Sequence, residues 1–313
     1  MELFFQQLVN GLSLGALYAL IAVGYTVVYG IIQLINFAHG EIFMIGAFGA
    51  LTVWLVVPGE VTAFWMLPLM LFCGMVAAIA VSLLTERFAY RPLRNAPRLA
   101  PLITAIGVSV FLQEFVRLFY GDIPGFPDSK RAIPFPQIDV VTGPAIQLGG
   151  VTIQRAALFT LVMLAICTVF LYIFVNRTRL GRAMQATSQD PDTARLMGIN
   201  VDRIIMVAFA LGAALAAVAG LAHGLRYTNI DFRMGFLAGL KAFTAAVLGG
   251  IGNIYGAVVG GLVLGVIEVM ATTYIPGQFG GSAWKDVWAF VILILVLVFR
   301  PQGLLGARVV DRA

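Results

Sequence analysis

Long stretches of this sequence contain no aspartate, glutamate, lysine or arginine. A helix needs roughly 20 largely apolar residues to span the hydrocarbon core of a bilayer, and several stretches reach that length on their own. Charged residues make up 11% of the 313 positions, whereas a soluble domain carries about 25%. The chain is therefore predicted to be α-helical and to cross a membrane many times. The uncharged stretches are 3–40, 42–59, 61–85, 99–113, 156–176, 204–225, 242–267 and 287–299, with His39 and His223 inside two of them.

The lengths of these stretches predict where the crossings lie. We treat residues 1–313 as one transmembrane domain, an all-α bundle of eight or nine spans. A glycine-flanked segment at 236–250 is short for a span and either crosses or is re-entrant. The opening Met-Glu-Leu-Phe lacks the basic region of a signal peptide, so the first span is expected to be retained. Crossings are expected near 8–29, 31–56, 62–84, 100–120, 156–176, 204–225, 254–275 and 284–299.

Arginine in the connections predicts the orientation, because cytoplasmic loops carry an excess of Arg and Lys. The 86–98 connection, the 177–203 connection and the C-terminal tail are arginine-rich and are placed in the cytoplasm. The 121–155 connection is balanced in charge and rich in Pro and Gly, which suits an extracytoplasmic loop. The 226–241 connection must then also lie outside, although it is basic. Its charged residues are Arg226, Asp231, Arg233 and Lys241, and the cytoplasmic arginines are Arg87, Arg91, Arg94, Arg98, Arg177, Arg179, Arg182, Arg195, Arg203, Arg300, Arg308 and Arg312.

The few polar residues argue against several classes of function. None of the three lysines, Lys130, Lys241 and Lys285, follows a glycine, so the sequence lacks the phosphate-binding loop of an ATPase. Two histidines and two cysteines form no cluster with metal-ligand spacing. No basic run alternates with aromatic residues, as a nucleic-acid surface would require. We therefore expect neither catalysis nor a metal or cofactor in this chain, and any uphill transport must draw its energy from a partner or an ion gradient.

A first polar insertion separates the first two apolar runs. Asn36, His39 and Glu41 fall within six residues. They form either a short cytoplasmic turn, with Glu41 at the positive end of the next helix, or a polar lining of a translocation path or gate. Both interpretations remain open on the sequence. Other polar residues near predicted span ends are expected to reach the lipid headgroups: Glu114, Arg117, His223 and Glu268.

Glycine forms a second distinctive pattern. Gly249, Gly250, Gly252 and Asn253 should break a helix. An unwound backbone at membrane depth is tolerated only inside protein or beside a water-filled cavity, and broken helices of this kind often bind substrate in transporters. These four residues are therefore further candidates for the translocation path. Elsewhere, pairs of glycines four residues apart predict close helix packing: Gly11/Gly15, Gly220/Gly224, Gly252/Gly256/Gly260 and Gly261/Gly265.

The 177–203 connection contains two short predicted helices. The first is amphipathic and includes Arg182 and Ala183. In the second, Asp190 is a suitable N-cap followed by Pro191, and Gly198 is the expected C-terminal stop. A helix this short is marginal alone, so it either lies on the bilayer surface or, as its Ala/Leu/Met face favours, docks into the groove of a partner.

At six places in order the sequence resembles LivH-type permeases, which belong to ABC importers for branched-chain amino acids. The resemblance implies a substrate path shared with a homologous second permease in a bacterial inner membrane. It further implies two ATP-binding subunits that hydrolyse ATP and a periplasmic binding protein that delivers leucine, isoleucine or valine. The matching segments are 10–22, 36–41, 181–183, 190–198, 235–252 and 299–306.

The same resemblance implies that the 181–198 segment transmits ATP-driven movement. The residues that match are Gly181, Arg182, Ala183, Asp190, Ala194 and Gly198, whereas Gln185 stands where relatives often carry arginine. Similar permeases serve other amino acids, amides or urea, so the substrate range stays open. A secondary transporter would need carboxylates or histidine buried in mid-span, of which the sequence offers almost none. A channel would have no need of a docking helix.

Overall fold

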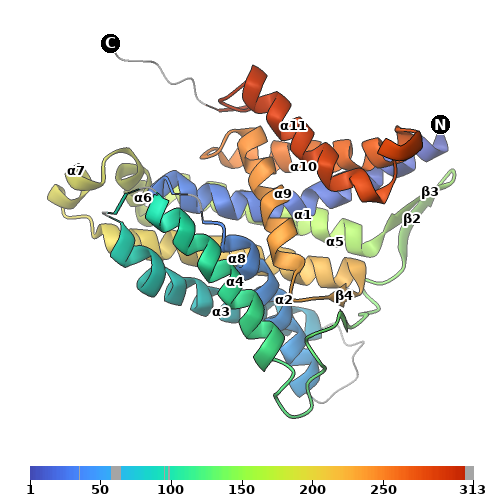
Figure 1. Ribbon diagram of the computed structural model, residues 1–313, viewed down its shortest axis with the longest axis horizontal. Coiled ribbons are helices and arrows are strands. Elements are labelled where there is room, and N and C mark those ends of the chain that lie inside the picture. The colour runs from blue at the N-terminus through green and yellow to red at the C-terminus, as the bar shows by residue number, and fades with distance from the viewer. Residues whose placement is uncertain (35, 58–64, 95, 98, 307–313) are drawn as a thin grey trace.

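The computed structural model describes residues 1–34, 36–57, 65–94, 96–97 and 99–306 (Figure 1). The chain is helical apart from two small antiparallel strand pairs. The helices are α1 (Glu2–Ile32), α2 (His39–Val56), α3 (Met66–Thr85), α4 (Leu99–Phe119), α5 (Arg155–Arg177), α6 (Arg179–Gln189), α7 (Pro191–Leu196), α8 (Val201–Tyr227), α9 (Met234–Gly249), α10 (Ile254–Tyr274) and α11 (Lys285–Phe299). The strands are β1 (Ile133–Pro134), β2 (Pro144–Leu148), β3 (Val151–Gln154) and β4 (Asn229–Ile230), and short helical turns lie at Glu86–Tyr90, Arg91–Leu93, Gly277–Phe279 and Ser282–Trp284.

Within the described ranges, eight helices are long and apolar enough to cross a membrane: α1, α2, α3, α4, α5, α8, α10 and α11. The predicted polytopic bundle is therefore confirmed. The largest difference concerns the second crossing, which begins at His39 instead of residue 31. It starts late because α1 ends at Gln33, whose backbone adopts the left-handed conformation (φ 53°). α9 is a further apolar helix of 16 residues, about 24 Å at 1.5 Å per residue.

Two arginine-rich connections lie at the same end of the molecule. Arg91 and Arg94 pair with Asp202 at the start of α8, which joins the 86–98 and 177–203 connections. The C-terminal segment is at this end too, because Asn253 Nδ2 donates to the Leu305 carbonyl oxygen at 2.9 Å. A small cavity shared by Gly252 and Gln185 places this contact beside α6. We call this the arginine-rich end; the predicted Arg98, Arg308 and Arg312 lie outside the described residues.

The opposite end carries the strands, and we call it the strand end. β1 pairs with β4, so the 121–155 connection meets the turn that follows α8. Gln6 accepts a hydrogen bond from the Thr152 backbone N–H at 2.7 Å and donates one to its carbonyl at 3.1 Å, which brings the N-terminus to β3. Figure 1 shows α6 and α7 at one extreme of the long axis and the β2–β3 hairpin at the other.

This arrangement makes α9 the helix that connects the two ends of the molecule. α8 finishes at the strand end and α10 begins at the arginine-rich end, so the short helix between them must connect the two. The N- and C-terminal segments consequently lie at opposite ends. Lys241 lies inside α9 and not in the preceding connection, so that connection is less basic than the sequence suggested. Its apparent conflict with the predicted orientation came from treating a helical residue as part of a loop.

Small residues bring the central helices together, as their spacing predicted. α1 is mostly buried and packs along α10. A Cβ atom at Gly15 would lie 2.7 Å from the Gly261 carbonyl oxygen, and one at Gly11 would lie 2.7 Å from Val266 Cα. Such backbone contact provides the dispersion attraction that replaces the hydrophobic effect within lipid. The outer helices instead expose large apolar side chains to their surroundings: Phe72, Val76, Ile103, Phe111, Ile166, Phe170, Leu295 and Phe299.

Candidate functional sites

Side-chain caps define the two short helices α6 and α7. Thr178 Oγ1 accepts from the Gly181 backbone N–H at 3.0 Å at the start of α6. Asp190 Oδ1 accepts from the backbone N–H groups of Asp192 and Thr193 at 3.0 and 3.1 Å at the start of α7. Gly198 has a φ of 81° and ends the segment in the left-handed conformation that glycine favours. The N-cap and stop predicted from the sequence are confirmed.

The Asp190 cap is complete at neutral pH. Hydrogen bonds from the Thr193 hydroxyl and then from the Thr193 backbone hold the pKa of this carboxyl below its usual value. A carboxyl group with a lowered pKa in the folded state stabilises that state above its unfolded pKa. The contribution is lost as the pH falls through the folded value. Only acidic conditions would therefore release this end of α7.

α7 ends in an exposed apolar pair, Leu196 and Met197, which we call the apolar tip. Their side chains are 87% and 79% exposed, although Ala194 in the same helix is buried. Gly181 is also buried, and a Cβ there would collide with the Phe174 and Val175 carbonyl groups. Gly181 and Ala194 thus position the segment, and Arg182 and the apolar tip are free to meet another molecule.

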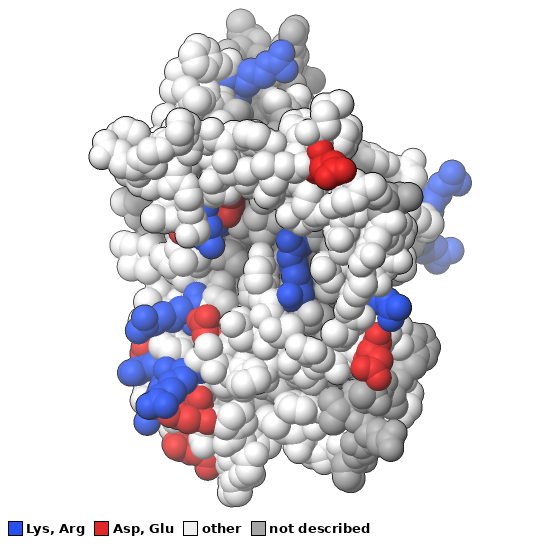
Figure 2. Space-filling model, turned by 90° about the vertical axis from the view of Figure 1, so that its right-hand side faces the viewer, with Lys and Arg blue, Asp and Glu red and all other residues white. Residues whose placement is uncertain are grey.

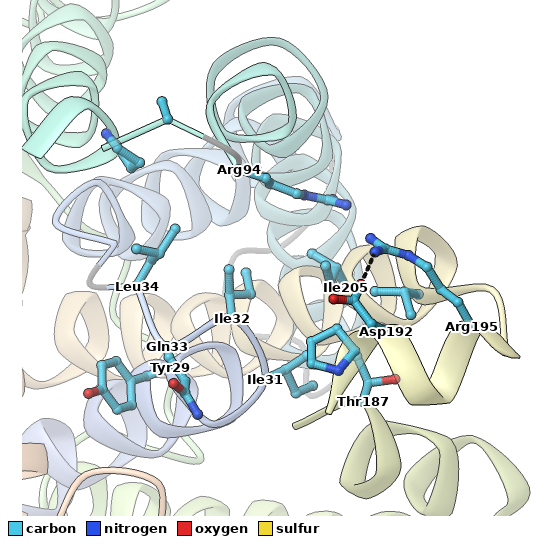
Figure 3. A pocket seen from close by; sticks show the side chains of 14 residues that line it. Tyr29, Ile31, Ile32, Gln33, Leu34, Arg94, Thr187, Asp192, Arg195 and Ile205 are labelled. Carbon is cyan, nitrogen blue, oxygen red and sulfur yellow. Dashed lines mark hydrogen bonds and ion pairs between the residues drawn. The ribbon is translucent and has the colours of Figure 1, made fainter. Parts of the chain in front are cut away.

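A cavity of about 530 Å³ separates α7 from the C-terminal end of α1. Figure 3 shows Arg94 extending from one wall of this cavity toward the Asp192–Arg195 ion pair on the other. Arg94 itself is held by Glu86 and Asp202. Because this space lies beneath α7, few contacts tie α7 to the membrane-spanning core.

The polar insertion at the start of α2 is enclosed within the protein. Asn36, His39 and Glu41 are all buried, Glu41 completely. Glu41 Oε1 accepts hydrogen bonds from Ser109 Oγ at 2.9 Å and from Gln113 Nε2 at 2.7 Å, both on α4. The chain turns inward after α1, so these side chains are buried, and Glu41 lies in the first turn of α2 as the turn interpretation expected.

Aromatic side chains also contact the polar insertion. Tyr90 donates to Asn36 Oδ1 at 2.6 Å, and the His39 ring lies 4.6 Å from that of Tyr25 on α1. A Cβ atom at Gly24 would collide with the imidazole, 2.5 Å from His39 Nε2. These three residues would line a path only if the surrounding helices moved apart.

The glycine-rich break at 249–253 is confirmed, and it separates two helices, α9 and α10. Gly250 and Gly252 have φ angles of 105° and 95°, and Asn253 caps α10 by accepting from the Tyr255 N–H at 3.0 Å. The backbone N–H of Leu305 donates to the Gly249 carbonyl at 2.9 Å, which places the break against the C-terminal segment. It forms the turn between α9 and α10 at the arginine-rich end.

The structure contains a buried cluster of charged residues that was not predicted from the sequence. Lys241 Nζ on α9 lies 2.8 Å from Glu268 Oε1 on α10 and 2.5 Å from Asp286 Oδ1 on α11. Tyr18 on α1 donates to Glu268 Oε2 at 3.0 Å and accepts from Lys241 at 3.2 Å. The side chains of Lys241 and Glu268 are 5% and 3% exposed. The prediction that Glu268 reaches the lipid headgroups is therefore wrong.

A sequence signal for this cluster did exist. Lys241 and Glu268 are lone charges that bound a long apolar run, and opposite charges enter a membrane at lowest cost as a pair. The described residues also bury Glu41 and Glu86. Buried carboxylates are thus more numerous than the sequence suggested. The number of buried carboxylates therefore does not exclude a secondary transporter.

Comparison with known proteins bears on the class directly. Residues 7–297 match the family described as branched-chain amino acid transport system / permease component. The chain is 47% identical to the high-affinity branched-chain amino acid transport system permease protein BraD of Pseudomonas aeruginosa, across 99% of this chain and 98% of that protein. It is 44% identical to the corresponding permease protein LivH of Escherichia coli, across 99% and 97%. Among solved structures, a putative metal-chelate type ABC transporter in an inward-facing conformation is 15% identical, with a TM-score of 0.49 and coverage of 95% and 85%.

Proposed function

This chain belongs to the family of branched-chain amino acid transport permeases, and from that premise we propose that it forms part of the membrane path for leucine, isoleucine or valine in an ABC importer. The observation that carries the proposal is the full-length identity of 47% to a permease protein of that transport system. The compact helical bundle with a capped helix pair outside the spans is consistent with it.

The importer needs partners that this chain does not supply. We propose a second, homologous permease beside it, two ATP-binding subunits and a periplasmic binding protein. We place the protein in a bacterial inner membrane. The arginine-rich end, including the C-terminal segment, then faces the cytoplasm, because loops rich in Arg and Lys stay on that side. The strand end, including the N-terminus, faces the periplasm and receives the substrate.

The segment from α6 to α7 is proposed to carry movement from the ATP-binding subunits. Leu196 and Met197 offer an apolar surface outside the spans, and exposed apolar pairs of this kind suit a hydrophobic groove on a partner. Gly181, Ala183 and Ala194 hold the segment against the core, Asp190 and Gly198 define its ends, and Arg182 contributes charge to the contact. The cavity beneath α7 leaves it room to shift.

Reconstitution tests the proposed function. The chain is expected to copurify with its ATP-binding subunits in mild detergent. Liposomes that contain the complete importer and external binding protein should accumulate labelled leucine only when ATP is supplied. A complex whose ATP-binding subunits cannot hydrolyse ATP is the control. Leucine uptake that does not depend on ATP would contradict the assignment. Uptake of urea or amides without uptake of leucine would contradict it too.

Leu196→Glu should uncouple the chain from its ATP-binding subunits. A carboxylate at an apolar contact must be desolvated without a partner, so copurification is expected to fall at least tenfold while membrane insertion is unchanged. Leu196→Met, which keeps the apolar surface, is the matched variant and should copurify normally. If both variants recovered the ATP-binding subunits equally, Leu196 would not be part of the contact with those subunits.

A further inference from the structure

A second cavity, of about 290 Å³, opens at the strand end. It lies between α1, the end of α8, α9 and the start of α11. This volume is close to the lower limit of small-molecule sites, about 300 Å³, so it suits a ligand the size of an amino acid. Figure 2, which views this end of the molecule, shows basic side chains in a recess within a largely uncharged face.

One side of this cavity is aliphatic. α1 contributes Leu14, Leu17 and Ile21, and α9 contributes Met234 and Leu237. No charge interrupts these five residues along the two helices that face each other here. A branched aliphatic side chain placed between them would be removed from water on both sides, which is favourable at about 25 cal/mol per Å² of apolar surface.

The other side of the cavity carries both signs of charge. Lys285 and Asp286 are adjacent at the start of α11, and Lys241 and Asp231 also line the cavity. Lys241 is shared between two carboxylates, since it also pairs with Glu268. Its contact with Asp286 Oδ1 lacks hydrogen-bond geometry, and that buried oxygen has no hydrogen-bond partner among the described residues.

Lys285 differs from Lys241 in its ion pairing. It lines the same cavity but makes no ion pair with any residue that the structure describes. The cavity therefore presents one ammonium group outside any ion pair among the described residues, Lys285, beside a carboxylate, Asp286, whose side chain is 34% exposed although its Oδ1 faces Lys241. Groups of this kind gain most from charge-assisted hydrogen bonds with a ligand of complementary charge.

We propose that this cavity is an acceptor site for the free amino acid as it enters the permease. The carboxylate of the amino acid pairs with Lys285, its ammonium group donates to Asp286, and its aliphatic side chain lies between α1 and α9. This inference rests on the proposed function and adds a site to it. A sugar or an amide would offer no carboxylate to Lys285 and no ammonium group to Asp286, so the site selects zwitterions with apolar side chains.

Photochemical labelling tests the site in the complete importer, held in nanodiscs without binding protein. The probe is photo-leucine, a diazirine analogue of leucine, and labelled peptides are identified by mass spectrometry. Labels are expected on the α1 and α9 residues that form the aliphatic wall. Leucine should compete at least tenfold better than leucinol, which lacks the carboxylate, or isocaproate, which lacks the ammonium group.

Lys285→Met should reduce this labelling at least fivefold. Since Lys285 belongs to no ion pair among the described residues, the variant should fold normally, and an unchanged thermal transition verifies this. Lys130→Met removes an exposed lysine from the 121–155 connection at the same end and should label as the wild type does. Asp286→Asn should also lower labelling and should narrow the advantage of leucine over isocaproate.

The site is overturned if labels fall elsewhere, if leucinol competes as well as leucine, or if Lys285→Met labels normally. ATP-dependent leucine uptake by the wild-type importer, measured in parallel with its binding protein, separates this failure from that of the proposed function. Intact uptake without labelling at the cavity removes the acceptor site alone. Absence of uptake removes the function and the site with it.

Discussion

Replacing Lys241 with methionine is expected to lower the free energy of unfolding by about 3–5 kcal/mol, the usual cost of removing one partner from a buried ion pair. The variant would leave Glu268, with a side chain 3% exposed, without its counter-charge among helices α1, α9 and α10. We expect a lower thermal transition and poor recovery as a single species in size-exclusion chromatography in detergent.

The double variant Lys241→Met/Glu268→Leu provides the control. Replacing both charges of a buried pair with apolar residues of similar volume is often close to neutral, so this variant should recover most of the lost stability. Asp286→Asn should cost less than Lys241→Met, because the Asp286 side chain is 34% exposed. If Lys241→Met were as stable as the wild type, burial of Glu268 would not depend on Lys241.

Gly265→Leu should have the second large effect, because it forces α1 and α10 apart. A Cβ atom at Gly265 would collide with the backbone of Gly15 and with the Gly11 carbonyl oxygen. Backbone atoms cannot rotate aside as a flexible side chain can, so the cost should exceed the roughly 1–3 kcal/mol typical of overpacking. We expect little folded protein in the membrane fraction after expression.

Gly107→Ala is the matched control for this glycine. Gly107 lies in the middle of α4, where a Cβ would meet no atom within 4 Å. Alanine is favoured over glycine in a helix by roughly 0.5–1 kcal/mol, so this variant should express at least as well as the wild type. If Gly265→Leu expresses equally well, α1 and α10 do not depend on close backbone contact.

Features with a local cause could be predicted from the sequence. The ends of α7 follow from the capping chemistry of Asp190 and the left-handed conformation at Gly198, both of which involve only neighbouring residues. The break near Gly250 is likewise local. Its position in the molecule was not predictable, since it depends on where α9 begins and on the C-terminal segment that packs against it.

The two polar features of the interior show the same limit. The sequence left Asn36, His39 and Glu41 open between a loop and a buried lining, because the burial of a side chain depends on helices distant in the chain. Glu41 is buried by Ser109 and Gln113, which lie on α4. Likewise, nothing local brings Lys241, Glu268 and Asp286 to one point.

By itself, the sequence determined that the chain crosses a membrane repeatedly and which connections share an end, because the cost of transferring charge into lipid applies to each segment separately. Only the tertiary structure decided that the short helix α9 connects the two ends of the molecule and that lone charges meet inside the bundle. A cavity of mixed charge at the strand end was likewise visible only once α1, α9 and α11 were packed. Such features depend on distances between segments far apart in the chain, and these arise from packing and not from the composition of any one helix.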